Sequence, residues 1–213
     1  MSRTGPLTKD STTVTLGLAQ IRVGLSSTYI GQVGPILGSS ASIGAMASTK
    51  FMGSSEVFRL ESGYPMLEDA VFPLRESAAI ECAFKEITPY NMALAQGKDP
   101  TASDYSAAHT GGIDLGTITA PVSIRMEAVY TYPDGSNLMY IIFPRAQVVS
   151  VTELEFAAEE PSAVTINLES KRADGGISGG HAIWNDRPLG RIIWDDGLDG
   201  VDSLSTTTTS TSP

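Results

Sequence analysis

Few residues in this chain have side chains that could perform chemistry. Its two histidines, His109 and His181, both lie in glycine-rich stretches, where Asp104, Asp114 or Asp186 could complete an acid–base or metal-binding pair. Their spacing matches no HxH or HExxH metal motif, and the chain contains no GxSxG, phosphate-binding loop or dinucleotide fingerprint. The pattern therefore favours a protein that is not an enzyme and that holds no cofactor.

Two further stretches match ligand-binding motifs only in part. The sequence GGISGG at 175–180 has the glycines of a phosphate loop, but no strand-to-helix context follows it. The acidic cluster WDDGLDGVD contains Asp195, Asp196, Asp199 and Asp202, but it lacks the closing glutamate and flanking helices of an EF-hand. We interpret this cluster as a solvated acidic tail and predict no metal site.

Composition limits the classes of function further. A length of 213 residues fits one large all-β domain, or one domain with long extensions. The formal charge of −10 excludes a protein that clamps nucleic acid by neutralising phosphates. Cys82 is the only cysteine, so no intramolecular disulfide can form, and its apolar neighbours predict a buried thiol. Because we find no signal peptide and no membrane-spanning apolar run, we expect a chain that is made and assembled in the cytoplasm and that does not insert into a membrane.

Period-two alternation of apolar residues predicts a strand-rich domain. We expect an N-terminal arm at 1–10, a β domain at 11–172 and a C-terminal extension at 173–213 with a low-complexity Thr/Ser-rich end. Long loops are expected at 26–55 and 98–120, and Phe72-Pro73 is expected to mark a bend. The expected strands are 12–25, 56–62, 74–87, 122–131, 137–143, 146–156 and 162–172.

One predicted strand, 137–143, is apolar on both faces. It returns from a turn at Pro133-Asp134-Gly135, where the glycine suits a left-handed conformation. A strand with two apolar faces needs cover on both sides. We expect the second cover to come from the helix described next or from a neighbouring subunit.

The stretch CAFKEITPYNMALAQG changes from strand alternation to a short helix at about 88–97. Thr88 suits the N-cap, Pro89 the first helical position and Gly97 a left-handed C-terminal cap. A helix of this length is unstable alone, so it must pack on the sheet. We therefore predict a mainly β fold, a β-sandwich or partial barrel with one short flanking α-helix.

The run SGYPMLEDAVFPLRESAAIECAFKEITPYNMALAQGKDP resembles the central segment of phage tail tube (major tail) proteins. The shared features are a Gly-x-Pro break, a downstream Phe-Pro, a long strand ending in Phe-Lys-Glu, and Thr-Pro-x-Asn opening an Ala/Leu helix that closes on glycine. The resemblance covers residues 56–100. It implies a structural virion protein whose six-fold rings stack into a hollow tube that conducts viral DNA to the host.

Within that family, the chain would be a homo-oligomer in the virion tail, with a tape-measure protein and tail-end or baseplate proteins as partners, and DNA would pass without specific binding. Candidate residues lining the lumen are Glu81, Glu127, Glu153 and Glu155, for which a solvent-facing sheet surface is the alternative. The apolar loop 26–55 and the C-terminal extension could pack on their own domain or on another subunit. Candidate intersubunit contacts are Ile36, Leu37, Ile43, Met46, Phe72, Trp184 and Trp194.

Two other functions stay open from the sequence. Trp184 and Trp194 could stack on sugars, which would make the chain a carbohydrate-binding or virion-binding β-sandwich module. The chain could also form the tube, or a terminating ring, of a related contractile injection system.

Overall fold

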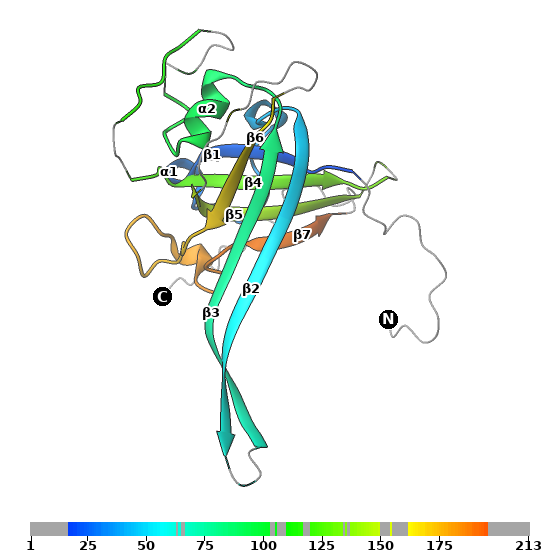
Figure 1. The fold of residues 1–213 in the computed structure, drawn as a ribbon, viewed down its shortest axis with the longest axis vertical. Coiled ribbons are helices and arrows are strands. Elements are labelled where there is room, and N and C mark those ends of the chain that lie inside the picture. Colours follow the sequence, from blue (N-terminus) through cyan, green and yellow to red (C-terminus); the bar gives the residue numbers. More distant parts are fainter. Residues whose placement is uncertain are drawn as a thin grey trace, which may run out of the picture.

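The computed structural model describes residues 17–62, 64, 67–102, 105, 110–116, 120–133, 135, 137–149, 154 and 162–195. This part of the chain is mainly β with short helices, which confirms the predicted fold class (Figure 1). Its strands are β1 (Gln20–Leu25), β2 (Met46–Ser62), β3 (Leu67–Phe84), β4 (Ile124–Thr131), β5 (Leu138–Val148), β6 (Val164–Ser170) and β7 (Arg191–Asp195). The helices are α1 (Ser26–Tyr29), α2 (Pro89–Ala95) and two 3₁₀ turns, η2 (Ser39–Ala41) and η4 (Ala182–Trp184).

All seven strands belong to one antiparallel sheet in the order β1-β4-β5-β6-β3-β2, with β7 added beside β5. The long strand β5 joins two parts of this sheet, because residues 138–142 pair with β7 and residues 146–148 pair with β6. In Figure 1 the strands β2, β3 and β6 cross over β1, β4, β5 and β7. The main core lies between the two parts and includes Ile21, Val23, Ile80, Cys82, Phe84, Ile124, Met126, Phe143, Ile166 and Leu168.

Helix α2 forms as its sequence predicts. The Thr88 hydroxyl accepts a hydrogen bond from the Asn91 backbone N–H at 3.2 Å, and Gly97 has a φ of +69° after the last turn. Leu94 and Ala95 enter the main core, so the helix lies on the sheet as expected. The Asn91 amide also donates to the Ile43 carbonyl oxygen at 2.8 Å, which ties the helix to the segment before β2.

A second core covers the other face of β4 and β5. It contains Val129, Tyr140, Ile142 and Ile193 from the strands, together with Val33, Ala173 and Trp184. The strand predicted at 137–143, which is apolar on both faces, forms part of β5. Its second face is covered by this chain's own segment 30–37 and C-terminal extension. The expectation that α2 or a neighbouring subunit supplies this cover is wrong.

The strand boundaries differ from the prediction in several places, and β7 lies in the extension, where no strand was predicted. Residues 46–55, expected in a loop, begin the 17-residue strand β2. Pro73 does not end a strand but lies inside β3, next to a register shift where Leu74 has no partner across the hairpin. Residues 146–148 continue β5 instead of starting a new strand. The expected N-terminal segment 1–10 and the Thr/Ser-rich C-terminal end lie outside the described residues.

Candidate assembly surfaces

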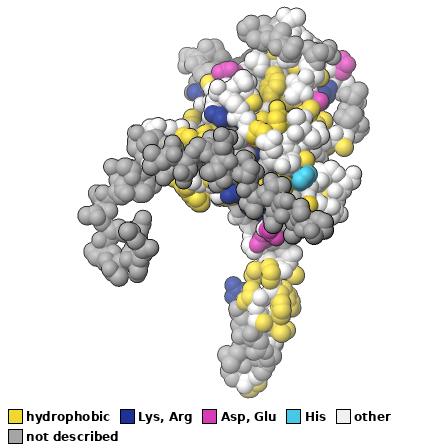
Figure 2. Space-filling view, turned by 180° about the vertical axis from the view of Figure 1, so that it is seen from behind, with side chains coloured by type: hydrophobic (Ala, Val, Ile, Leu, Met, Phe, Trp, Pro, Cys, Tyr) yellow, Lys and Arg dark blue, Asp and Glu magenta, His cyan; other side chains and the backbone are white. Residues whose placement is uncertain are grey.

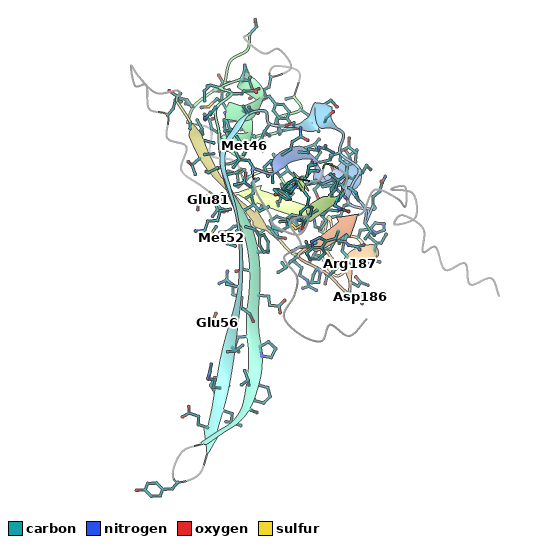
Figure 3. All side chains as sticks on the ribbon, turned by 90° about the vertical axis from the view of Figure 1, so that its right-hand side faces the viewer. Met46, Met52, Glu56, Glu81, Asp186 and Arg187 are labelled. Carbon is teal, nitrogen blue, oxygen red and sulfur yellow. The ribbon has the colours of Figure 1, made fainter. Side chains whose placement is uncertain are left out.

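The hairpin of β2 and β3 extends far beyond the rest of the molecule (Figures 1 and 3). Within the described ranges, β3 pairs with β6 only over 79–84, and β3 is the one strand paired with β2. We call the outer part of this hairpin, 54–77, the arm. Eight residue steps from Ser54 to Ser62, at about 3.4 Å each, give it a length of about 27 Å. Two-stranded hairpins are marginally stable in isolation, so a surface that covered the apolar side chains of the arm would stabilise it.

Both faces of the arm carry exposed apolar side chains, and Figure 2 shows the apolar surface on one side of it. Phe58 lies opposite Phe72 in the register, and each side chain is 50% exposed. On the other face, Val57 lies opposite Pro73, next to Val71, and both valines are exposed. Contiguous exposed apolar surface on a long open edge strand is typical of a protein interaction site.

A polar surface covers the outer side of β2, β3 and β6, away from the main core. Register places Lys50, Glu81 and Asn167 in one row across the three strands. The next row contains Met52, Ala79 and Glu169. Glu81 is exposed here and points away from the body in Figure 3, so it remains a candidate for a lumen wall.

The other lumen candidates have different outcomes. Glu127 has no exposed surface, so the prediction that it lines a lumen is wrong. The physical reason is that both faces of β4 are covered, including the face that alternation marks as polar. Glu153 and Glu155 lie outside the described residues.

Glu127 instead forms a buried ion pair with Arg125 at 2.7 Å, and this pair organises the segment 29–37. The Arg125 guanidinium donates to the backbone carbonyl oxygens of Tyr29, Gln32 and Gly34 at 2.5–3.0 Å. Burial lowers the pKa of Arg125, while the adjacent Glu127 carboxylate opposes that shift.

The Glu127 carboxylate accepts hydrogen bonds from the backbone N–H groups of Ile36, at 3.1 Å, and Leu37, at 3.0 Å. The pair therefore satisfies five backbone groups of a segment that has almost no secondary structure. The sequence contained one signal for this ion pair. Arg125 and Glu127 are two residues apart on one strand, and the next strand is apolar on both faces.

Most candidate intersubunit contacts are packed inside their own subunit. Leu37, Ile43 and Trp184 are buried, and their prediction as contacts between subunits is wrong. The Trp184 indole N–H donates to the Ile30 carbonyl oxygen at 2.5 Å. Ile36 and Met46 are partly buried, Met46 against the main core.

Two of these candidates remain available for contacts, namely Phe72 on the arm and Trp194 on β7. Trp194 is 65% exposed, and its indole N–H donates to the Tyr132 hydroxyl oxygen at 3.2 Å.

The described residues that could perform chemistry do not gather into a site. The His181 ring caps η4, with Nδ1 accepting from the Ile183 N–H at 3.2 Å, while Asp114 and Asp186 are exposed. His109 and Asp104 lie outside the described residues. Within the described ranges, no group of three or more His, Cys, Asp or Glu side chains could hold a metal ion. None of the helices described there is long and apolar enough to cross a membrane.

Comparison with known proteins found matches only among solved structures: no family model matches the chain, and no curated protein does. The fold is similar to a chain from the tail of an empty GTA particle with C6 symmetry, at a TM-score of 0.42 and 10% identity, covering 73% of this chain and 92% of that one. It is also similar to a chain from the sheath–tube complex of PVC, an extracellular contractile injection system (TM-score 0.41, 13% identity, 87% and 95% covered).

A third similar chain comes from the sheath/tube terminator of the same injection system (TM-score 0.41, 16% identity, 85% and 97% covered). These structures come from tail and tube assemblies.

Proposed function

We propose that this chain is the structural subunit of a hollow tail tube, which polymerises as stacked six-fold rings and conducts viral DNA. The observation that carries the proposal is the arm, which has two exposed apolar faces and one open edge. The arm and the body are different surfaces, so contacts between them are head-to-tail, and such contacts generate rings or filaments. The tape-measure and tail-end partners, the virion location and assembly in the host cytoplasm follow from the resemblance of segment 56–100.

The polar surface around Glu81 is our proposed lumen wall. It combines acidic and basic groups with small or neutral side chains, as in the row of Lys50, Glu81 and Asn167. A chain with a net charge of −10 would repel phosphates overall, so DNA could slide past such a wall without being held.

Electron microscopy of the purified protein tests the proposal, with Phe58→Ser, Phe72→Ser as the arm variant. Each phenylalanine is half exposed, so docking would remove about 100 Å² per ring from water, worth about 2.5 kcal/mol each. We expect tubes from the wild type, and a more than hundredfold higher critical concentration for the arm variant.

The matched control is Leu115→Ser, because Leu115 is 81% exposed but lies far from the arm in the chain. It should form tubes as the wild type does. A wild-type protein that stays monomeric at every concentration, and in native particles, would refute the proposal. Rings that form but do not stack would favour a terminating ring instead of a tube.

The carbohydrate-binding alternative is weakened by the burial of Trp184, which cannot stack on a sugar. Only Trp194 could serve in that role. Glycan binding that is lost in Trp194→Ala, in a protein that forms no rings, would favour this alternative.

A further inference from the structure

Strand β3 has one residue more in the arm than its pairing with β2 requires. Glu56 lies opposite Arg75, and the next residue of β2, Val57, lies opposite Pro73, so Leu74 is bulged out between two pairs. Its side chain is 62% exposed, so packing in the core does not explain its presence. Bulges leave one residue unpaired and re-aim the side chains that follow. The position of Leu74 therefore indicates a role for the bulge itself.

The bulge changes the side of the hairpin that Phe72 occupies. Strict alternation along β3 would place Phe72 on the same side as Ile80, which is fully buried in the main core. The register instead places it opposite Phe58, and alternation along β2 puts Phe58 on the outer side, away from the core. If pairing continued without a bulge, Phe72 would lie opposite Arg59, and the two rings would be on different sides. The bulge thus creates the aromatic pair.

The polarity of the outer side changes at the same point. Between the body and the bulge, the cross-strand pairs on this side are mostly polar: Lys50–Glu81, Met52–Ala79, Ser54–Ser77 and Glu56–Arg75. Figure 3 shows Glu56 and Glu81 on the same side of the hairpin. Beyond the bulge the pairs are apolar, namely Phe58–Phe72 and Leu60–Ala70. Water suits the first surface, whereas a contiguous apolar surface is typical of a protein contact.

We propose that the bulge at Leu74 marks the end of the lumen wall and turns the aromatic pair to the wall's own side of the sheet, where a second copy of this chain covers it. The row of Glu56 and Arg75 is then the last one that passing DNA meets. This inference rests on the proposed tube function. It adds where the wall ends and which side of the arm docks.

Two variants that both remove the bulge separate the side of the arm from its shape. Deleting Leu74 leaves Phe72 opposite Phe58 on the outer side. Inserting threonine between Glu56 and Val57 gives Leu74 a partner, so the same two rings again lie opposite each other, but alternation now turns them to the core side. Each variant is therefore the matched control for the other.

A cysteine pair, Leu60→Cys, Ala70→Cys, verifies the pairing in the wild type and in both variants. The two residues lie directly opposite each other, which places their Cα atoms about 4.5–5.5 Å apart, within the reach of a disulfide. Mild oxidation of unassembled protein should cross-link the arm within one chain in all three proteins. The native Cys82 is buried and stays silent.

Electron microscopy of the same three proteins without the cysteine pair then measures assembly. The wild type and the Leu74 deletion should form tubes at critical concentrations within about threefold of each other, because no docking contact is lost. The insertion should raise the critical concentration more than about hundredfold, as Phe58→Ser, Phe72→Ser does, because both rings face away from the surface that covers them.

The outcomes separate this inference from the proposed function. An insertion variant that assembles as the wild type does would show that the side is immaterial, and a deletion with the defect of the insertion would show that the bulge serves to bend the arm. Either result overturns the inference and leaves the tube intact. A bulge-free variant without the disulfide would assign the bulge to pairing within the arm and also overturn it. Wild-type protein that forms no tubes would remove both proposals.

Discussion

Replacing Glu127 with alanine should destabilise the subunit by several kcal/mol. The substitution leaves the Arg125 guanidinium fully buried without its counter-ion, and it removes the acceptor for two backbone N–H groups. Removing one partner of a buried pair costs about 3–5 kcal/mol. That is a large share of the roughly 5–15 kcal/mol by which folded proteins exceed their unfolded states.

The backbone contacts make this pair different from an isolated buried ion pair. Replacing both partners with apolar residues of similar volume is often neutral or stabilising elsewhere. Here Arg125→Met, Glu127→Leu would leave three carbonyl oxygens and two N–H groups of segment 29–37 without partners. Since each buried unsatisfied group costs about 1–3 kcal/mol, the double variant should also be destabilised by several kcal/mol.

Urea unfolding of dilute, unassembled protein measures both values, and Glu81→Ala serves as the control. Glu81 is exposed on the same sheet, so its removal should change the free energy of unfolding by less than about 0.5 kcal/mol. A loss of less than about 1 kcal/mol for Glu127→Ala, or a double variant as stable as the wild type, would refute the role assigned to the pair.

Two further predictions concern the core and the docking of β7. Burial, and then the charge of Glu81, raise the pKa of the Cys82 thiol from 9.0 to about 12, so native protein at pH 8 should react with maleimide only as fast as it unfolds. The free energy of unfolding should fall as pH rises from about 9 towards 12, because in that range only the unfolded thiol ionises. Rapid labelling of folded protein would contradict this prediction. Gly190→Ala should lower the free energy of unfolding in urea by more than about 2 kcal/mol, because the added Cβ would lie 2.1 Å from the Ile142 carbonyl oxygen. The control Gly179→Ala also has a positive φ but open space around it, so it should cost about 1 kcal/mol. Equal losses for the two variants would show that β7 accommodates the methyl group.

Some elements could be predicted from the sequence because residues close together in the chain determine them. Helix α2 could be predicted almost to the residue, because Thr88, Pro89 and Gly97 each meet a requirement of a helix end. The hairpin from β4 to β5 was also predictable, since an alternating strand and a strand apolar on both faces flank a turn with a left-handed Gly135. Signals of this kind depend only on neighbours in the chain.

Elements that depend on contacts with residues far away in the sequence could not be predicted. Residues 46–55 end a tract, 26–55, that is rich in glycine, serine and alanine, yet they form a strand because β3 offers a hydrogen-bonding edge. Glu127 sits at a position that alternation marks as solvent-facing, but the C-terminal extension and segment 30–37 cover that face. The role of Trp184 was missed for the same reason, since its indole N–H donates to Ile30, about 150 positions earlier, and the cluster that buries it includes residues of β4 and β5.

The same distribution of contacts separates folding from assembly. The body of the subunit is complete by itself: its own extension covers the second face of β4 and β5, and its buried ion pair is satisfied by its own backbone. The arm is the reverse, with apolar side chains on both faces and, among the described residues, no strand beyond β2. Substitutions in the body should therefore change the free energy of unfolding first, and those in the arm the critical concentration for assembly. A subunit built in this way can fold before it meets another copy, and in the proposed assembly the apolar faces of its arm are buried only on docking, when the buried apolar area offsets the entropy lost on association.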